Sequence, residues 1–184
     1  DLRLRGEYGY GIYPNVVTSI QFERILSASG PYFGHVQRIS DGKEPKKIAF
    51  IQCVGSRDTS CGNSWCSSVC CMYATKEAII GKEHAKGMEP TIFFMDIRAH
   101  GKDFDRFVNR AKNEYGIRYI RSMPSTISPT EEEDGIARTM SRSAARRSAC
   151  RNSTGSMFLS TKPSAPTKSA RLIEKVASVF YNLT

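Results

Sequence analysis

The chain has 184 residues, 40% of them hydrophobic, which is enough for one domain with a packed core. Its formal net charge is +9, from 27 Lys and Arg against 18 Asp and Glu. No apolar run approaches the roughly 18 residues of a membrane-spanning helix, and the start DLRLRGEYGYG lacks the apolar segment of a signal peptide. These features predict no membrane-spanning helix and no signal peptide. Because the first residue is not Met, we expect an internal fragment or a processed chain.

The basic charge is uneven, since residues 135–171 contain eight Lys or Arg and no Asp or Glu. A basic stretch of this kind can bind nucleic acid. It is also typical of a solvated tail, which is the interpretation we favour. We therefore expect no nucleic-acid partner, although a basic interaction segment stays open as an alternative.

The first predicted helix follows a Gly- and Tyr-rich stretch that closes on Pro14. Thr18 and Gln21 have the spacing of a capping box, with Thr18 as the N-cap and Gln21 at the third helical position. The helix after this cap should bury Phe22, Ile25 and Leu26. Turn residues between 31 and 47 then predict a loop.

Three strands alternate with two helices over the middle of the chain. The apolar runs KIAFIQCV and TIFFMDI predict strands buried on both faces, and IRYI predicts a third. A helical pattern runs from Ser67 to about Lys86, and Asp103 can cap a second helix with one apolar face. The order β-α-β-α-β predicts an α/β fold with a Rossmann-like parallel sheet and right-handed crossovers.

The pattern changes after about residue 130. Twelve of the 31 residues from 139 to 169 are Ser or Thr, and no sustained period is visible. The segment ARLIEKVASVFYNL, residues 170–183, predicts a modest amphipathic helix. We therefore expect an irregular basic C-terminal tail that ends in a short helix.

Five of the six cysteines lie between positions 53 and 71. Cys53 follows the first strand of the β-α-β pattern, and Cys66, Cys70 and Cys71 form a C-x3-C-C group at the start of the next helix. Thiolates crowded in this way are typical of a shared metal or cluster in a reducing cytoplasm, whereas adjacent cysteines suit a disulfide framework poorly.

The predicted strand-to-helix junction would bring the four thiolates together. With Ser67 as the first helical residue, Cys66 would be the N-cap and would share a helix face with Cys70. Free backbone N–H groups at a helix N-terminus favour anionic sulfur. The spacing favours an iron–sulfur cluster over tetrahedral zinc, and redox or structural thiols remain a further alternative. Cys61 is interpreted as a free loop thiol, and Cys150 receives no role.

The junction also occupies the place of a dinucleotide-binding loop. It retains one glycine, Gly55, which is weak support for phosphate binding, so a nicotinamide site is not expected here. Asp96, at the end of the second strand, stands where a ribose-binding acid lies in nucleotide folds. We favour an ordinary ion pair at the strand end for this residue.

Three segments resemble one protein family. They are PNVVTSIQFERILSASGPYFGHVQRISDGKEPKKIAFIQCVGSRD, WCSSVCCMYATKEAIIGKEH and IFFMDIRAHGKDFDRFVNRAKNEYGIRYIRS. Together they are similar to the A-type iron–sulfur subunit of heterodisulfide reductase from methanogens, related archaea and several anaerobic bacteria. The resemblance covers about residues 1–125, and Trp65 stands where the family commonly has Tyr.

The resemblance implies an oxidoreductase with a thioredoxin-reductase-like nucleotide-binding body. It implies a [4Fe–4S] cluster held by Cys53, Cys66, Cys70 and Cys71 beside an FAD. Such subunits relay electrons among flavin, clusters and the other heterodisulfide reductase subunits. Ferredoxin and hydrogenase- or formate dehydrogenase-type donors are the implied partners, and in methanogens the flavin splits electrons between ferredoxin and the CoM-S-S-CoB heterodisulfide.

Compared with the family, the chain lacks the glycine fingerprint for FAD and the ferredoxin repeats. We expect a fragment of a longer subunit, which is inactive by itself. Residues 1–45 would be a remnant of the flavin-domain segment and a linker, 46–126 the Rossmann-like domain with the cysteines, and 127–184 the basic tail. Because the family pattern ends near residue 130, a frameshift in the tail is our hypothesis. The alternative function is a non-enzymatic, zinc-stabilised structural or interaction module.

Overall fold

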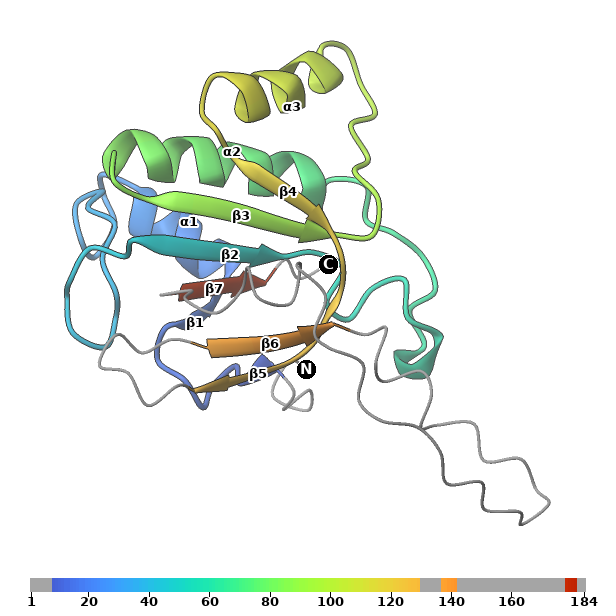
Figure 1. Ribbon diagram of the computed structural model, residues 1–184, viewed down its shortest axis with the longest axis horizontal. Helices are drawn as coiled ribbons and strands as arrows, with labels where there is room; N and C mark the ends of the chain where they lie inside the picture. Colours follow the sequence, from blue (N-terminus) through green and yellow to red (C-terminus); the bar gives the residue numbers. More distant parts are fainter. Residues whose placement is uncertain (1–7, 130–136, 142–177, 182–184) are drawn as a thin grey trace, which may run out of the picture.

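The computed structural model describes residues 8–129, 137–141 and 178–181 of the chain (Figure 1). A parallel sheet with helices forms the body, so the predicted α/β class is confirmed. The elements are β1 (Val16–Thr18), α1 (Ser19–Leu26), β2 (Lys47–Ile51), η3 (Thr59–Cys61), α2 (Cys70–His84), β3 (Glu89–Phe94), α3 (Phe104–Asn113), β4 (Arg118–Arg121), β5 (Pro124–Pro129), β6 (Ala137–Ser141) and β7 (Ser178–Tyr181).

The main sheet has five parallel strands in the order β1-β7-β2-β3-β4. The strands β2, β3 and β4 are the three that the sequence pattern predicts, with α2 and α3 as the connections between them. Parallel pairing places the carboxyl ends of these strands along one edge. The residues that follow β2 and β3 therefore lie near one another.

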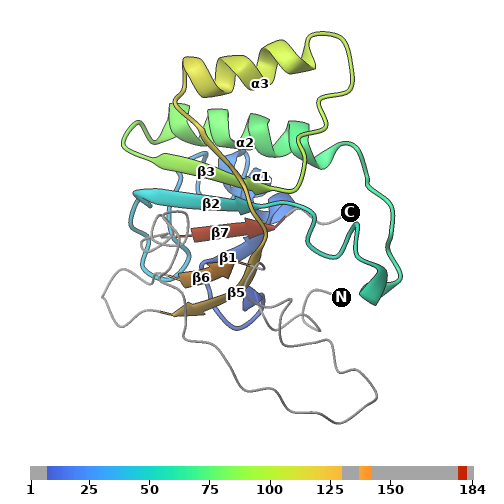
Figure 2. The same cartoon turned by 45° about the vertical axis from the view of Figure 1, so that its right-hand side comes forward.

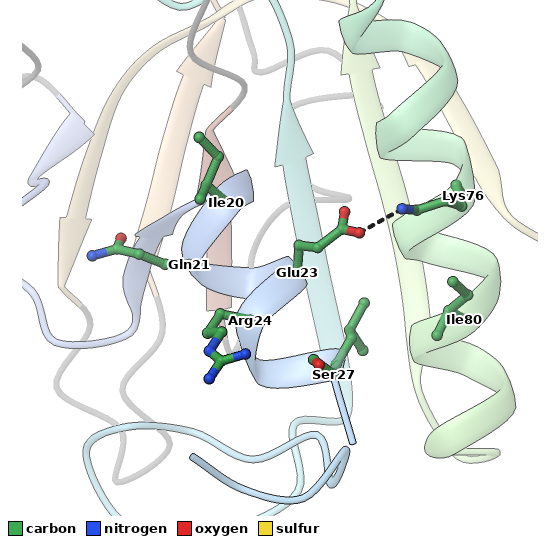
Figure 3. Close-up of a pocket in the computed structure, with 8 residues that line it drawn as sticks. Ile20, Gln21, Glu23, Arg24, Ser27, Lys76 and Ile80 are labelled. Carbon is green, nitrogen blue, oxygen red and sulfur yellow. Dashed lines mark hydrogen bonds and ion pairs between the residues drawn. The ribbon is translucent and has the colours of Figure 1, made fainter. Parts of the chain in front are cut away.

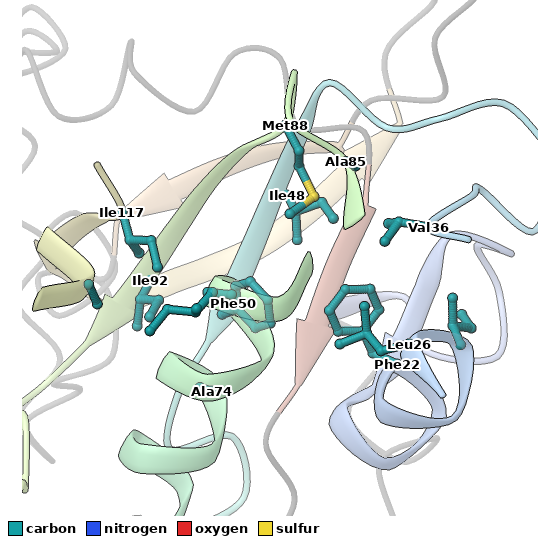
Figure 4. Packing of buried hydrophobic residues seen from close by; sticks show 14 of the residues in the cluster. Phe22, Leu26, Val36, Ile48, Phe50, Ala74, Ala85, Met88, Ile92 and Ile117 are labelled. Atoms are coloured by element: carbon teal, nitrogen blue, oxygen red, sulfur yellow. The ribbon is translucent and has the colours of Figure 1, made fainter. Parts of the chain in front are cut away.

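The side chains of β2 alternate between the two faces of the sheet. Ile48 and Phe50 pack against α1 and α2, together with Phe22 and Ile92 (Figure 4). Phe50 is fully buried and lies edge-on to Phe22, with 5.7 Å between the ring centroids. This face is the larger apolar core, and it fixes both helices on the sheet.

The other face of the sheet is covered by the N-terminal segment and by β5. Ala49 and Ile51 of β2 pack there with Tyr8 and Ile127. The Tyr8 hydroxyl donates a 2.8 Å hydrogen bond to the main-chain oxygen of Pro124. Strand β5 pairs antiparallel with β6 in a second, two-stranded sheet.

The predicted start of α1 is confirmed. The Thr18 hydroxyl accepts from the Gln21 N–H, and the Gln21 side chain accepts from the Thr18 N–H at 2.8 Å. The predicted buried face is also found, since Phe22, Ile25 and Leu26 are buried. Asp103 occupies the N-cap position of α3, but its side chain makes no capping hydrogen bond.

The prediction that α2 begins at Ser67 is wrong. The helix begins at Cys70, and its N-cap is Val69. Ser68 has a φ of 64°, which is outside the helical region and stops the helix from extending further back. Cys66 is therefore a loop residue and not the helix cap.

Within the predicted C-terminal tail, the described residues form two short strands. Residues 178–181 form β7, a central strand between β1 and β2, so the terminal helix predicted over 170–183 is wrong at these positions. The segment SVFY is rich in β-branched and aromatic residues, which suit a strand. Strand β6 likewise lies in the predicted tail. Residues 142–177, with most of the basic stretch, lie outside the described residues.

Candidate metal centre

The four predicted ligand residues lie at the carboxyl edge of the sheet. Cys53 comes two residues after β2, and Cys70 and Cys71 are the first residues of α2. Cys66 lies in the intervening loop, which extends past the end of β2 in both views (Figure 2). None of the four forms a disulfide, and Cys53, Cys70 and Cys71 are buried.

The loop after β2 has an unusual backbone. Cys53, Gly55 and Arg57 have φ values of 60°, 76° and 54°. The left-handed region suits glycine, but at a residue with a side chain it costs about 1–3 kcal/mol. Strain of this kind persists where surrounding contacts hold it, and it concentrates at functional sites.

Hydrogen bonds within the loop hold this backbone. The Asn63 amide donates to the Gly55 oxygen at 2.9 Å, and the Arg57 N–H donates to the Trp65 oxygen at 3.0 Å. Asp58 caps η3 by accepting from the Ser60 N–H at 2.9 Å. The segment between Cys53 and Cys66 is therefore a folded loop that returns the chain toward α2.

The thiols influence one another electrostatically. Burial raises the pKa of Cys53, and negative charge on Cys70 or Cys66 raises it further, whereas the Arg57 charge opposes this. A hydrogen bond from Cys71 lowers the pKa of Cys70, and the same contact raises the pKa of Cys71. Cys53 is thus within electrostatic range of Cys66, Cys70 and Cys71, and we call these four residues the cysteine site.

Two main-chain contacts involve the thiols of Cys66 and Cys71. The Ser68 N–H donates to the Cys66 sulfur at 3.3 Å, and the Cys71 thiol donates to the Asp96 oxygen at 3.7 Å. The first contact shows that the loop presents a donor to sulfur. The second joins the start of α2 to the end of β3.

The donor set fits an iron–sulfur cluster. Four thiols from a loop and a helix N-terminus supply soft anionic ligands, and the free N–H groups of α2 favour their negative charge. Within the described residues, no three Cys, His, Asp or Glu side chains are grouped as a site for one metal ion. A cluster spaces its ligand sulfurs more widely than a single ion does, because each sulfur binds a different iron.

Asp96 is an ion-pair residue, as the sequence interpretation favours, but its partners are two arginines that were not predicted. Its carboxylate accepts from Arg57 and from Arg121, each at 2.9 Å. The hydrogen bond from Arg57 is the largest of the effects that lower the pKa of Asp96 below its usual range. The residue thus ties the loop after β2 to β4. The sequence showed Arg57 only as part of CVGSRD, and its contact depends on how the loop folds back.

A groove of about 660 Å³ lies between α1 and α2 (Figure 3). The Lys76 ammonium and the Glu23 carboxylate form an ion pair across it at 2.6 Å. A second pocket of about 370 Å³ shares Ile20 and Glu23 with this groove. Its lining also includes Ser67 and Val69, the sequence neighbours of Cys66 and Cys70.

The two remaining cysteines carry less information. Cys61 ends η3, and its side chain is outside what the structure describes. Cys150 lies in the part of the chain that is not described. The interpretation of Cys61 as a bystander stays a prediction.

Together, the fold and the site define a class of protein. It is an α/β protein with a Rossmann-like parallel sheet in which cysteines occupy the strand-to-helix junction that normally binds a cofactor phosphate. A scan against protein-family models gives no match.

Curated relatives identify the family. The chain is 54% identical over 123 residues to the second A-type iron–sulfur subunit of CoB–CoM heterodisulfide reductase in Methanopyrus kandleri, covering 67% of this chain and 19% of that protein. It is 45% identical over 136 residues to the corresponding iron–sulfur subunit of Methanocaldococcus jannaschii, covering 74% and 21%. It is 50% identical over 121 residues to the A-type subunit of H2:CoB–CoM heterodisulfide,ferredoxin reductase in Methanothermobacter thermautotrophicus, covering 66% and 18%.

The matched part of the chain belongs to the family of A-type iron–sulfur subunits of heterodisulfide reductases, as its CVGSRD and CSSVCCMY segments predict. The chain spans about a fifth of the length of these relatives. Within the described residues, no helix has the length and apolar character needed to cross a bilayer.

Proposed function

We propose that this chain is the cluster-binding part of an iron–sulfur flavoprotein subunit of heterodisulfide reductase type. In this proposal Cys53, Cys66, Cys70 and Cys71 ligate a [4Fe–4S] cluster. The cluster supplies one-electron transfer between FAD and further clusters or subunits. The whole flavoprotein is proposed to act in the cytoplasm.

One observation carries the proposal: four cysteines that form no disulfide follow β2 or begin α2 at the carboxyl edge of the sheet, in a chain whose relatives are named as iron–sulfur subunits. Four thiolates fill the ligand positions of a cluster, so no iron is left open to activate a substrate. This arrangement favours electron relay over bond-making chemistry.

The residues of the chain would each have a defined task. Cys53 holds the cluster to the sheet, because it follows a central strand, and Cys70 and Cys71 hold it to the N-terminus of α2. Burial of these three thiols limits the access of water and oxygen. Cys66 closes the site from the loop, with its sulfur fixed by the Ser68 N–H.

FAD and the redox partners would come from outside the described residues. The pocket beside the groove is lined by Ser67 and Val69, which are next to Cys66 and Cys70 in the sequence. We propose that a redox cofactor exchanges electrons with the cluster from this side. Relatives are named as reductases of ferredoxin or as enzymes that use H2 or formate, and donors and acceptors of these kinds are the proposed partners.

The test is anaerobic assembly of the cluster in the full 184-residue chain. Four irons and four sulfides per chain, with an electron paramagnetic resonance signal after one-electron reduction, are expected. Serine at any of the four ligand positions should reduce bound iron several-fold. Cys61→Ser and Cys150→Ser serve as matched controls and should retain it.

The zinc alternative makes a different prediction for the same preparation. A colourless chain with one zinc and no paramagnetic signal would support a structural module and would overturn the cluster. Loss of iron in Cys61→Ser but not in Cys66→Ser would show that Cys61, and not Cys66, is a ligand.

A further inference from the structure

Arg57 is held rigidly beside the cysteine site. Its main-chain N–H donates to Trp65, and its Nη2 donates to the Asp96 carboxylate at 2.9 Å. Asp96 is itself fixed, because it also accepts from Arg121, whose Nε donates to the Met95 oxygen at 2.9 Å. Contacts of the Arg57 main chain and of its guanidinium group therefore hold this side chain in place.

The positive charge of Arg57 is within electrostatic range of the Cys53 sulfur. The side chain of Arg57 is 22% exposed, compared with 75% for Arg121. Partial burial lowers the screening of a charge by solvent, so Arg57 acts on the cysteine site more strongly than an exposed arginine would.

One guanidinium nitrogen has no assigned acceptor. Arg57 Nη1 is buried and has no hydrogen-bond partner among the described residues. An unsatisfied buried donor costs about 1–3 kcal/mol. The strained φ of 54° at Arg57 adds to this cost. A sulfur acceptor at the cysteine site would satisfy the donor and would account for the conformation.

We propose that Arg57 donates a hydrogen bond from Nη1 to a sulfur at Cys53 and raises the reduction potential of the cluster there. Asp96 acts as the positioning residue that holds the guanidinium group. This inference rests on the cluster of the proposed function.

The physical reason is the charge of the reduced state. Reduction adds one electron and no proton, so the cluster becomes more negative by one charge. A fixed cation and a hydrogen bond to sulfur stabilise that state more than the oxidised state. Because an arginine stays protonated throughout the working pH range, its effect should not depend on pH.

The test compares two arginines that share one carboxylate. The midpoint potential of the reconstituted 184-residue chain is measured by titration with dithionite and electron paramagnetic resonance. Arg57→Gln should lower the equilibrium constant for reduction about tenfold, or about 59 mV for one electron, equally at about pH 6.5 and about pH 8.5. Arg121→Gln, the matched control, should change it much less.

The outcomes separate this inference from the proposed function. A wild-type chain that assembles no cluster overturns both. A wild-type cluster with an unchanged potential in Arg57→Gln, or an equal shift in Arg121→Gln, overturns only the role of Arg57. If Arg57→Gln fails to assemble, Arg57→Lys is measured in its place. Lysine retains the positive charge but lacks the forked N–H donors of arginine. The cluster of Arg57→Lys should therefore have a lower reduction potential than the wild-type cluster, and an equal potential would overturn the proposed hydrogen bond to sulfur.

Discussion

Glu77 on α2 lies within hydrogen-bonding reach of Glu23 on α1, and the charge of Glu23 opposes ionisation of its neighbour. Glu23 is paired with Lys76 at 2.6 Å. Glu77 is 1% exposed, and its Oε2 has no partner among the described residues. Two carboxyl groups therefore meet between the helices, and the buried one is the neutral member.

Glu77→Gln should make the chain more stable at alkaline pH. Burial, followed by the Glu23 charge, raises the pKa of Glu77 to about 9 from an ordinary value of 4.5. The folded state thus retains a proton that the unfolded state loses above about pH 4.5, so the contribution of Glu77 to stability is full below that pH and falls as the pH rises toward 9. Glutamine does not titrate, and the variant should gain at least about 1 kcal/mol over the wild type by about pH 8.

The measurement is urea unfolding of both chains at about pH 5, 6.5 and 8 under anaerobic conditions, followed by circular dichroism. The difference in unfolding free energy should grow with pH. Glu44→Gln, at an exposed loop position, is the control and should show a flat difference. A flat difference for Glu77→Gln would contradict the buried neutral carboxyl group.

Gly55→Ala should destabilise the loop that carries Cys53. Gly55 has a φ of 76°, and a methyl group there would meet no atom within 4 Å, so the cost is conformational and not steric. A loss of about 1–2 kcal/mol in unfolding free energy is expected, with less iron retained after reconstitution. Gly87→Ala is the control, since Gly87 also has open space but is not in the left-handed region. Equal effects of the two changes would argue against the strained loop.

Phe50→Ala tests the core that fixes the helices on the sheet. Phe50 is fully buried against Phe22. Removal of the ring should cost about 3–5 kcal/mol of unfolding free energy, because it leaves a cavity between β2 and the helices. The measurement is thermal unfolding of the variants and the wild type. Phe33 is 79% exposed, so Phe33→Ala is the control and should change the unfolding free energy by less than about 1 kcal/mol. Similar losses in both variants would show that Phe50 is packed differently.

Thr18→Ala tests the capping box of α1. The change removes the acceptor of the Gln21 N–H and should cost about 1 kcal/mol of unfolding free energy. Thr18→Ser retains the hydroxyl and should recover most of that loss. Because the cap holds the first turn of α1, amide hydrogens in this turn should exchange faster in the alanine variant. Unchanged exchange in α1 would contradict the role of the cap.

Local patterns in the sequence were sufficient for much of this fold. The apolar runs of β2 and β3 are buried on both faces of the sheet, so their composition predicts them without reference to neighbours. The capping box at Thr18 and Gln21 involves residues three apart, and its hydrogen bonds form within one turn. Cys53 follows a strand and Cys70 starts a helix, which is why the sequence by itself placed them at the same edge.

Other features depend on contacts between distant segments, and only the tertiary structure decided them. Strand β7 pairs with β1 and β2 across more than a hundred residues, and its isolated sequence also suits a helix. The start of α2 is set by the left-handed Ser68 and not by helix propensity. Arg57 meets Asp96 because a strained loop folds back over the sheet edge. The sequence by itself therefore determined which cysteines we propose as ligands, and long-range packing decided which charged residues lie near them, because pairing over such separations leaves no local pattern.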